Sequence, residues 1–166
     1  MEFVLEKAGM ADLDAIVQLF KAAVKALEAN NIHQWDEIYP DRETLRGDIL
    51  AEQMYAVRLN GAITAVCVLN QDYSKEYDDG DWQYKDASFY VVHRLCVNPA
   101  FQNQGIGTKT MLLAEAMLRE MGIETLRLDA FIPNAASNRM YQKLGYVKTG
   151  EVTWRKGRFY LYEKKL

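Results

Sequence analysis

A long apolar strand, a glycine loop and a helix follow one another in the middle of the chain, and this succession most constrains its fold. Ser88–Val97 reads SFYVVHRLCV, a run rich in β-branched and aromatic residues that ends before Pro99. Gln102–Gly107 then reads QNQGIG, and Ile106–Met121 has apolar residues at helical spacing up to Gly122. A glycine-bearing loop that opens a helix presents unpaired N–H groups to an anion. The sequence therefore predicts a strand–loop–helix unit that can hold a phosphate.

The remaining segments predict a mixed α/β order. Strand patterns cover 2–8, Met54–Leu59, Ala62–Leu69, Thr125–Phe131 and two segments of the tail around Lys156-Gly157. Helical spacing covers the segments from about Asp12 to Glu28, from Pro40 to Leu50 and over Ser137–Leu144. Asn60-Gly61 between two β-rich runs indicates a hairpin. The predicted order is βααβββαβαββ, an α/β (α+β) fold in one domain over residues 1–166.

Charge and cysteine usage exclude several classes of protein. The 20 Lys and Arg residues are outnumbered by 23 Asp and Glu, so a broad nucleic-acid surface is not expected. No stretch approaches 18 apolar residues and the first residues do not resemble a signal peptide, so we expect a cytoplasmic protein without a membrane span. Cys67 and Cys96 lie in apolar runs and are expected to be buried thiols. Two Cys and two His without a C-x-x-C pair give no zinc pattern, so no metal is expected.

Two well-known phosphate loops do not fit the QNQGIG stretch. A Walker loop needs Lys directly after its last glycine, whereas Gly107 is followed by Thr108 and then Lys109. A dinucleotide fingerprint needs a third glycine where this chain has Thr110. A glycine turn without any ligand is the simplest alternative. A second polar cluster about thirty residues later, Asn134–Tyr141, argues for a ligand site instead.

The two clusters together resemble the GNAT superfamily of acyl-CoA-dependent N-acetyltransferases. Gln102–Gly107 is similar to the family's Q-x-x-G-x-G loop. Asn134, Tyr141 and Gly145-Tyr146 are similar to its N-x-x-A-x-x-x-Y-x-x-x-G-[FY] segment, with Ser137 in place of the alanine. The resemblance is specific between about residues 88 and 147. It implies a mostly antiparallel sheet of about seven strands flanked by about four helices, and acetyl-CoA as co-substrate.

The resemblance also implies where acetyl-CoA is held. The pyrophosphate is expected on main-chain N–H groups at the start of the helix, and the pantetheine arm along the end of the preceding strand, where the N–H of Leu95 would face the thioester carbonyl. Asn134 would contact the arm or brace the loop, with Asn138 one helical turn on. Lys109 is expected to be solvated. The expected cofactor-binding residues are Leu95, Cys96, Val97, Gln102, Asn103, Gln104, Gly105, Ile106, Gly107, Thr108, Asn134, Asn138 and Tyr141.

Two catalytic residues are expected. Tyr141 matches the family's general acid, which protonates the leaving thiolate. His93 is the candidate base, because an amine must lose a proton before it attacks, and simple alternation would place His93 on the same face as Leu95 and Val97. His33, a water chain and a purely structural role for His93 remain alternatives. No cysteine or serine with a paired base stands out as a nucleophile, so transfer is expected to be direct.

The acceptor is expected to be a small-molecule or protein amine, and its identity is left open. The loop 72–86 carries six acids and two lysines, so it is either a rim that attracts a cationic amine, with Trp82 or Tyr84 covering its methylenes, or an ordinary solvated loop. A non-catalytic acyl-CoA sensor and a structural subunit are the other interpretations. Exposed strands at the C-terminus make a homodimer possible.

Overall fold

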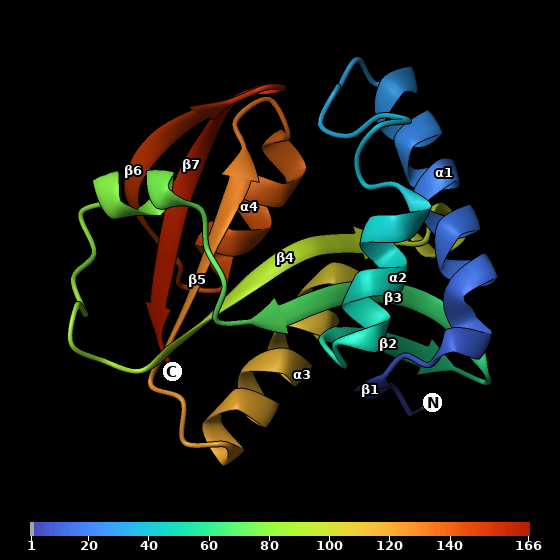
Figure 1. Ribbon diagram of the computed structural model, residues 1–166, viewed down its shortest axis with the longest axis horizontal. Helices are drawn as coiled ribbons and strands as arrows, with labels where there is room; N and C mark the ends of the chain where they lie inside the picture. The colour runs from blue at the N-terminus through green and yellow to red at the C-terminus, as the bar shows by residue number, and fades with distance from the viewer. Residues whose placement is uncertain (1) are drawn as a thin grey trace. The chain divides into compact units, whose positions relative to one another are not determined.

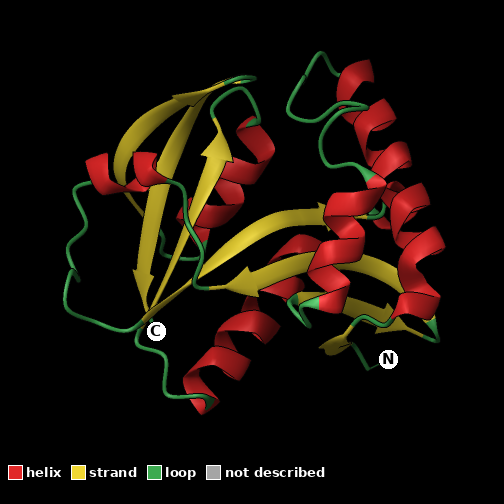
Figure 2. Cartoon of the chain, in the orientation of Figure 1, coloured by secondary structure: helices red, strands yellow, loops and turns green. Residues whose placement is uncertain are grey.

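The computed structural model describes residues 2–166, which form a mixed α/β fold with one seven-stranded sheet (Figures 1 and 2). The predicted order βααβββαβαββ is confirmed. The strands are β1 (Val4–Lys7), β2 (Met54–Leu59), β3 (Ala62–Asn70), β4 (Phe89–Val97), β5 (Thr125–Phe131), β6 (Val147–Trp154) and β7 (Gly157–Lys165). The α-helices are α1 (Leu13–Ala29), α2 (Arg42–Leu50), α3 (Ile106–Glu120) and α4 (Ala135–Lys143).

The strands follow the order β1-β2-β3-β4-β5-β7-β6. The ladders β1–β2, β2–β3, β5–β7 and β6–β7 are antiparallel, whereas β4 and β5 pair in parallel. The parallel ladder runs from Phe89 opposite Thr125 to Val92 opposite Leu128. β4 itself continues to Val97, so its last residues lie beyond this register.

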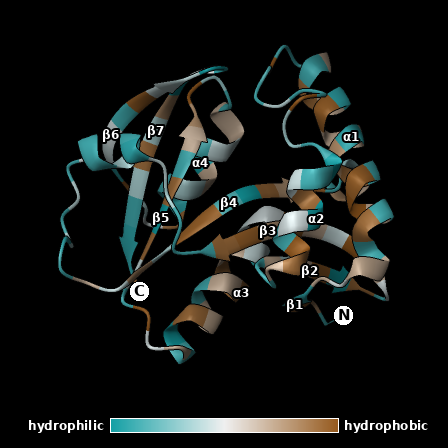
Figure 3. Cartoon of the chain, viewed as in Figure 1, coloured by the Kyte–Doolittle hydropathy of each residue, from teal (hydrophilic) through white to brown (hydrophobic). Residues whose placement is uncertain are grey.

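The chain divides into two compact units. Unit 1 comprises the residues up to Leu69 together with Arg94–Ala114, and unit 2 comprises Asn70–His93 and Glu115–Leu166. In unit 1, α1 and α2 supply residues such as Ile16 and Leu45 to a core that includes Val66 of β3. Another cluster joins Val57 of β2 to Ile106 of α3. Figure 3 shows the corresponding apolar colouring along β3.

Unit 2 has an aromatic core around β7. Leu161 of β7 packs with Tyr77, Trp82 and Val91, while the next residue, Tyr162, lies beside Tyr141 of α4. Because successive side chains of a strand point to opposite faces, β7 separates these two groups. The acidic segment that includes Tyr77 and Trp82 is therefore built into this core and is not a detached surface loop.

Local sequence chemistry sets most of the element boundaries. The Asp41 carboxylate accepts the backbone N–H of Thr44 and caps α2. Asn134 caps α4 in the same way, and this explains why the helix begins at Ala135 and not at the predicted Ser137. The predicted Asn60-Gly61 hairpin is confirmed, with both residues at positive φ. The last hairpin turns one residue earlier than expected, because Gly157 already belongs to β7.

Candidate functional site

The QNQGIG loop lies in unit 1 and opens α3. Gln102, Asn103, Gln104 and Gly105 are all exposed, and α3 begins at Ile106. The first carbonyl bond of the helix runs from the N–H of Lys109 to Gly105, so the N–H groups of Ile106, Gly107 and Thr108 have no partner within the helix. No acidic residue stands in this first turn. The loop therefore leaves a helix N-terminus available to an anion.

Two residues of this loop have a left-handed backbone. Asn103 has φ 63° and Gly105 has φ 73°. Asparagine and glycine are the residues that adopt this conformation most readily, which explains their presence here. A Cβ at Gly105 would meet no atom of the protein within 4 Å, so its conformation and not crowding requires the glycine in the free protein.

The end of β4 departs from the predicted alternation. Arg94 has φ 50° in mid-strand, so the regular two-residue alternation is interrupted between His93 and Leu95. Alternation alone therefore does not place His93 on the face of Leu95 and Val97, and that shared face stays a prediction. Cys96 is buried, whereas Leu95 and Val97 are half-buried, and all three belong to unit 1.

Arg94 is held by two side chains of unit 1. Its Nε and Nη2 donate to the two carboxylate oxygens of Asp48 at 2.8 and 2.6 Å, and its Nη1 donates to the Tyr39 hydroxyl at 2.6 Å. Burial raises the pKa of Asp48 above its usual value, although the guanidinium opposes this shift. Arg94, whose backbone is strained, thus forms a bidentate ion pair with Asp48 of α2.

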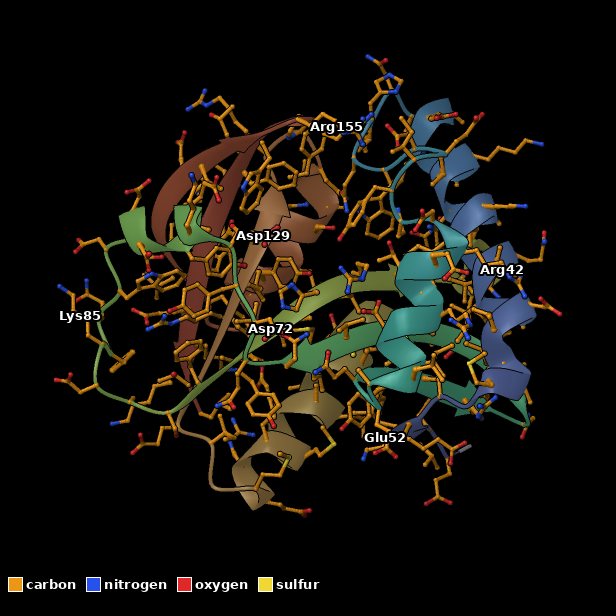
Figure 4. The ribbon with its side chains drawn as sticks, in the orientation of Figure 1. Arg42, Glu52, Asp72, Lys85, Asp129 and Arg155 are labelled. Carbon is orange, nitrogen blue, oxygen red and sulfur yellow. The ribbon has the colours of Figure 1, made fainter. Side chains whose placement is uncertain are left out.

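His93 is the last residue of unit 2 on β4 and is half-buried. Its Nε2 lies 2.8 Å from Oδ1 of Asn70 and 3.0 Å from the backbone oxygen of Asp72. The N–H of Asp72 donates to the same Oδ1 at 2.9 Å. Figure 4 labels Asp72, just after β3. The alternative base, His33, is exposed and contacts only Asn31 among the hydrogen bonds described.

The polar residues of α4 lie in unit 2. Asn134 is buried, and its side chain caps the helix through Ser137. The Asn138 amide donates to the carbonyls of Phe131 and Asn134, while its Oδ1 accepts the Tyr162 hydroxyl at 2.6 Å. Asn138 therefore ties α4 to β5 and β7, while its contact with the cofactor stays a prediction.

Tyr141 is buried on α4 between two other tyrosines. Its ring centroid lies 5.9 Å from those of Tyr146 and Tyr162. The Tyr146 hydroxyl donates to Oε2 of Glu115 at 2.8 Å, and Lys164 donates to Oε1 at 2.8 Å. Burial, and then the Glu115 carboxylate, raises the pKa of Tyr146 far above its usual value. The orientation of Tyr141 thus depends on rings that are themselves fixed by hydrogen bonds.

The acidic loop is anchored more firmly than its composition predicts. Trp82 is buried, and its indole N–H donates to the carbonyl of Tyr77 at 2.6 Å. The Arg127 guanidinium carbon lies over the rings of Trp82 and Phe89, 4.3 and 4.0 Å from their centroids. Tyr77 donates to Asp129, which Figure 4 labels on β5. Trp82 therefore cannot cover a bound amine as proposed, whereas Tyr84 is exposed.

Several residues of these networks were not anticipated from the sequence. Asn70 follows an apolar run, Asp48 precedes one and Glu115 interrupts one, which is a weak signal. Their partners His93, Arg94 and Tyr146 lie 23 to 46 residues away along the chain, so local patterns do not reveal them. Within residues 2–166 no group of three or more His, Cys, Asp or Glu is placed to hold a metal ion. No helix in the same part of the chain is long and apolar enough to cross a membrane.

Comparison with known families settles the class of protein. A family model described as the acetyltransferase (GNAT) family matches residues 17–146. The chain belongs to the GNAT family. It is accordingly an acetyl-CoA-dependent N-acetyltransferase, as the loop and the α4 segment predicted.

Individual relatives agree with this GNAT assignment. An L-methionine sulfoximine/L-methionine sulfone acetyltransferase of Salmonella typhimurium is 27% identical over 157 residues, which cover 87% of this chain and 80% of that protein. A GNAT-family acetyltransferase from Streptococcus agalactiae superposes with a TM-score of 0.87 at 20% identity, covering 99% of this chain and 95% of that one. The PaiA N-acetyltransferase of Thermoplasma acidophilum, solved with coenzyme A, gives 0.74 at 19% identity over the whole of both chains.

Proposed function

We propose that this GNAT protein acts as a single acetyltransferase domain that moves an acetyl group directly from acetyl-CoA to a primary amine. The observation that carries the proposal is the exposed N-terminus of α3, where Asn103 and Gly105 take left-handed conformations and no acid occupies the first turn. A pyrophosphate would accept hydrogen bonds from the main-chain N–H groups of Asn103, Gln104, Gly105, Gly107 and Thr108. The helix dipole adds about 0.3–1 kcal/mol to the binding of an anion at such a position.

The pantetheine arm would pair with the backbone of Leu95, Cys96 and Val97. These residues follow the strained Arg94 and lie beyond the register that β4 shares with β5, which supports free backbone groups there. The N–H of Leu95 would stabilise the oxyanion of the tetrahedral intermediate. Cys96 is buried and its pKa is raised by burial, which argues against a covalent acetyl-cysteine intermediate.

The proton transfers in this mechanism balance as follows. His93 takes one proton from the ammonium group, and the amine lone pair then forms the C–N bond. The C–S bond breaks, and Tyr141 gives its proton to the departing thiolate. The surplus proton on the new amide nitrogen returns to the Tyr141 phenolate, and the proton on His93 leaves to solvent. Asn134, which caps α4, would contact the arm near Tyr141.

The binding part of the proposal is tested by comparing two glycines. Gly105→Ala and Gly122→Ala place a Cβ at φ 73° and 82°, and neither Cβ would meet another atom within 4 Å. Both variants should therefore lose a similar amount of stability, about 1–2 kcal/mol. Only Gly105→Ala should weaken coenzyme A binding, measured by calorimetry and thermal shift. Equal coenzyme A affinities in the two variants would contradict phosphate binding at the loop.

The catalytic part is tested with Tyr141→Phe in a thiol-release assay over a panel of amines that includes L-methionine sulfone, spermidine and lysine. The variant keeps the ring and its packing, so coenzyme A affinity should stay unchanged while kcat falls by about tenfold or more. An unchanged kcat would assign proton donation to another group. Coenzyme A binding with no turnover on any amine would favour the sensor interpretation.

A further inference from the structure

The hydrogen bonds around His93 determine which of its two nitrogens can act as the base. Nε2 faces two oxygens, Oδ1 of Asn70 at 2.8 Å and the backbone oxygen of Asp72 at 3.0 Å. A carbonyl oxygen can only accept a hydrogen bond, so the Asp72 contact requires a proton on Nε2. In the neutral imidazole the other nitrogen, Nδ1, is then the one with the basic lone pair.

The orientation of the Asn70 amide is fixed independently. The oxygen and nitrogen of an asparagine side chain are distinguished by their hydrogen bonds. The backbone N–H of Asp72 points at Oδ1 of Asn70 at 2.9 Å, and a rotated amide would place two donors against each other. Oδ1 therefore serves both the Asp72 N–H and the His93 Nε2–H. Asn70 is buried at the end of β3, where its side chain has little freedom to rotate.

We propose that Asn70 is a positioning residue that, with the carbonyl of Asp72, holds His93 as the Nε2–H tautomer, so that Nδ1 receives the proton of the acceptor amine. This inference rests on the proposed role of His93 as the base. Proton uptake at Nδ1 leaves both Nε2 hydrogen bonds intact, so the ring does not have to turn between the neutral and charged forms. The two oxygens also stabilise the positive charge of the imidazolium.

The tautomer can be measured without any knowledge of the acceptor. The chain contains two histidines, so His33→Gln leaves His93 as the only source of histidine signals. Nitrogen-15 NMR of this variant, above the pH at which His93 titrates, should show protonated Nε2 and unprotonated Nδ1. The opposite tautomer, or an equal mixture, would overturn the proposal whether or not His93 is the base.

Variants of Asn70 test its positioning role. Asn70→Ala removes one hydrogen-bond acceptor of Nε2, so the Nε2–H tautomer of His93 should no longer strongly outnumber the Nδ1–H tautomer. The kcat should fall about five- to tenfold, with an unchanged KM for acetyl-CoA. Asn70→Asp keeps both hydrogen bonds and the shape of the side chain. It should retain the tautomer and raise the apparent pKa of the acidic limb of the kcat/KM profile, because a carboxylate favours the imidazolium.

A neighbouring residue gives the matched control. Gln71 is exposed and its amide donates to the carbonyl of Phe89, not to His93. Gln71→Ala should leave the tautomer and the pH profile unchanged. A change as large as that caused by Asn70→Ala would show that Asn70 has only a structural role and would contradict its positioning role. If Asn70→Asp retains the Nε2–H tautomer but His93→Gln keeps full kcat, Asn70 does position His93, and His93 is not the base.

Discussion

Replacing Asp48 with asparagine tests whether the ion pair with Arg94 holds the end of β4 in its strained conformation. The Asp48 and Arg94 side chains are only 10% and 14% exposed. Removing one partner of a buried pair costs about 3–5 kcal/mol, because the remaining charge has lost both water and counter-charge. Asparagine keeps one acceptor oxygen for the guanidinium, so we expect a loss near 3 kcal/mol, at the lower end of that range.

Asp14 supplies the matched control for this prediction. It lies 2.7 Å from Arg42, but the two side chains are 85% and 53% exposed. Exposed pairs contribute about 0–1 kcal/mol, and the position of Asp14 in the first turn of α1 adds a few tenths more. Asp14→Asn should therefore cost at most about 1.5 kcal/mol, roughly half the effect of Asp48→Asn.

Urea unfolding followed by far-UV circular dichroism measures both variants. With a slope of about 2 kcal/mol per molar urea, Asp48→Asn should lower the midpoint by about 1.5 M and Asp14→Asn by less than about 0.8 M. Arg94→Gly and Arg94→Ala give a further comparison, because only glycine relieves the backbone at φ 50°. The glycine variant should be about 1–2 kcal/mol more stable than the alanine variant. Equal midpoints within either pair would refute the reasoning.

Two further predictions concern the tyrosines around Tyr141 and a buried thiol. Tyr146→Phe keeps the ring beside Tyr141 but removes the hydroxyl that donates to Glu115 at 2.8 Å. The free energy of unfolding in urea should fall by about 1–3 kcal/mol, and kcat should fall while the KM for acetyl-CoA changes less. A change in KM alone would contradict the role of Tyr146 in positioning Tyr141. Burial raises the pKa of Cys67 from 9.0 to about 12, because the folded state disfavours the thiolate. The contribution of the neutral thiol to the free energy of unfolding is therefore complete below about pH 9 and is lost as the pH rises toward 12. The unfolding free energy should fall less steeply between pH 8 and 11 in Cys67→Val than in the unmodified chain, and parallel curves would show that Cys67 does not titrate on unfolding.

The sequence predicted the fold because its signals are local. Glycine at positive φ ends α3 and α4, at Gly122 and Gly145, and apolar periodicity identifies each strand and helix. The candidate phosphate loop was recognisable for the same reason, since Asn103 and Gly105, the residues with left-handed backbones, stand within three positions of each other.

The rest of the candidate site depends on partners that are distant along the chain. Arg94, where the alternation of β4 is interrupted, binds a carboxylate 46 positions away, which the stretch SFYVVHRLCV alone does not reveal. Trp82 is buried because it packs with Arg127 and Phe89, although its neighbours in the sequence are acidic. Asn138 occurs at a helical position that suits a ligand, yet Tyr162 and two carbonyls occupy its amide.

The acid-free first turn of α3 has a practical consequence for anyone who measures this enzyme. The first turns of α1 and α2 contain Asp14 and Glu43, which satisfy the positive ends of those helices, but α3 has no such internal counter-charge. Inorganic phosphate or sulfate in the buffer should therefore compete with coenzyme A for the same amides. Coenzyme A affinities determined in phosphate-buffered saline should be weaker than those in a buffer without phosphate or sulfate, by a factor that grows with the oxyanion concentration.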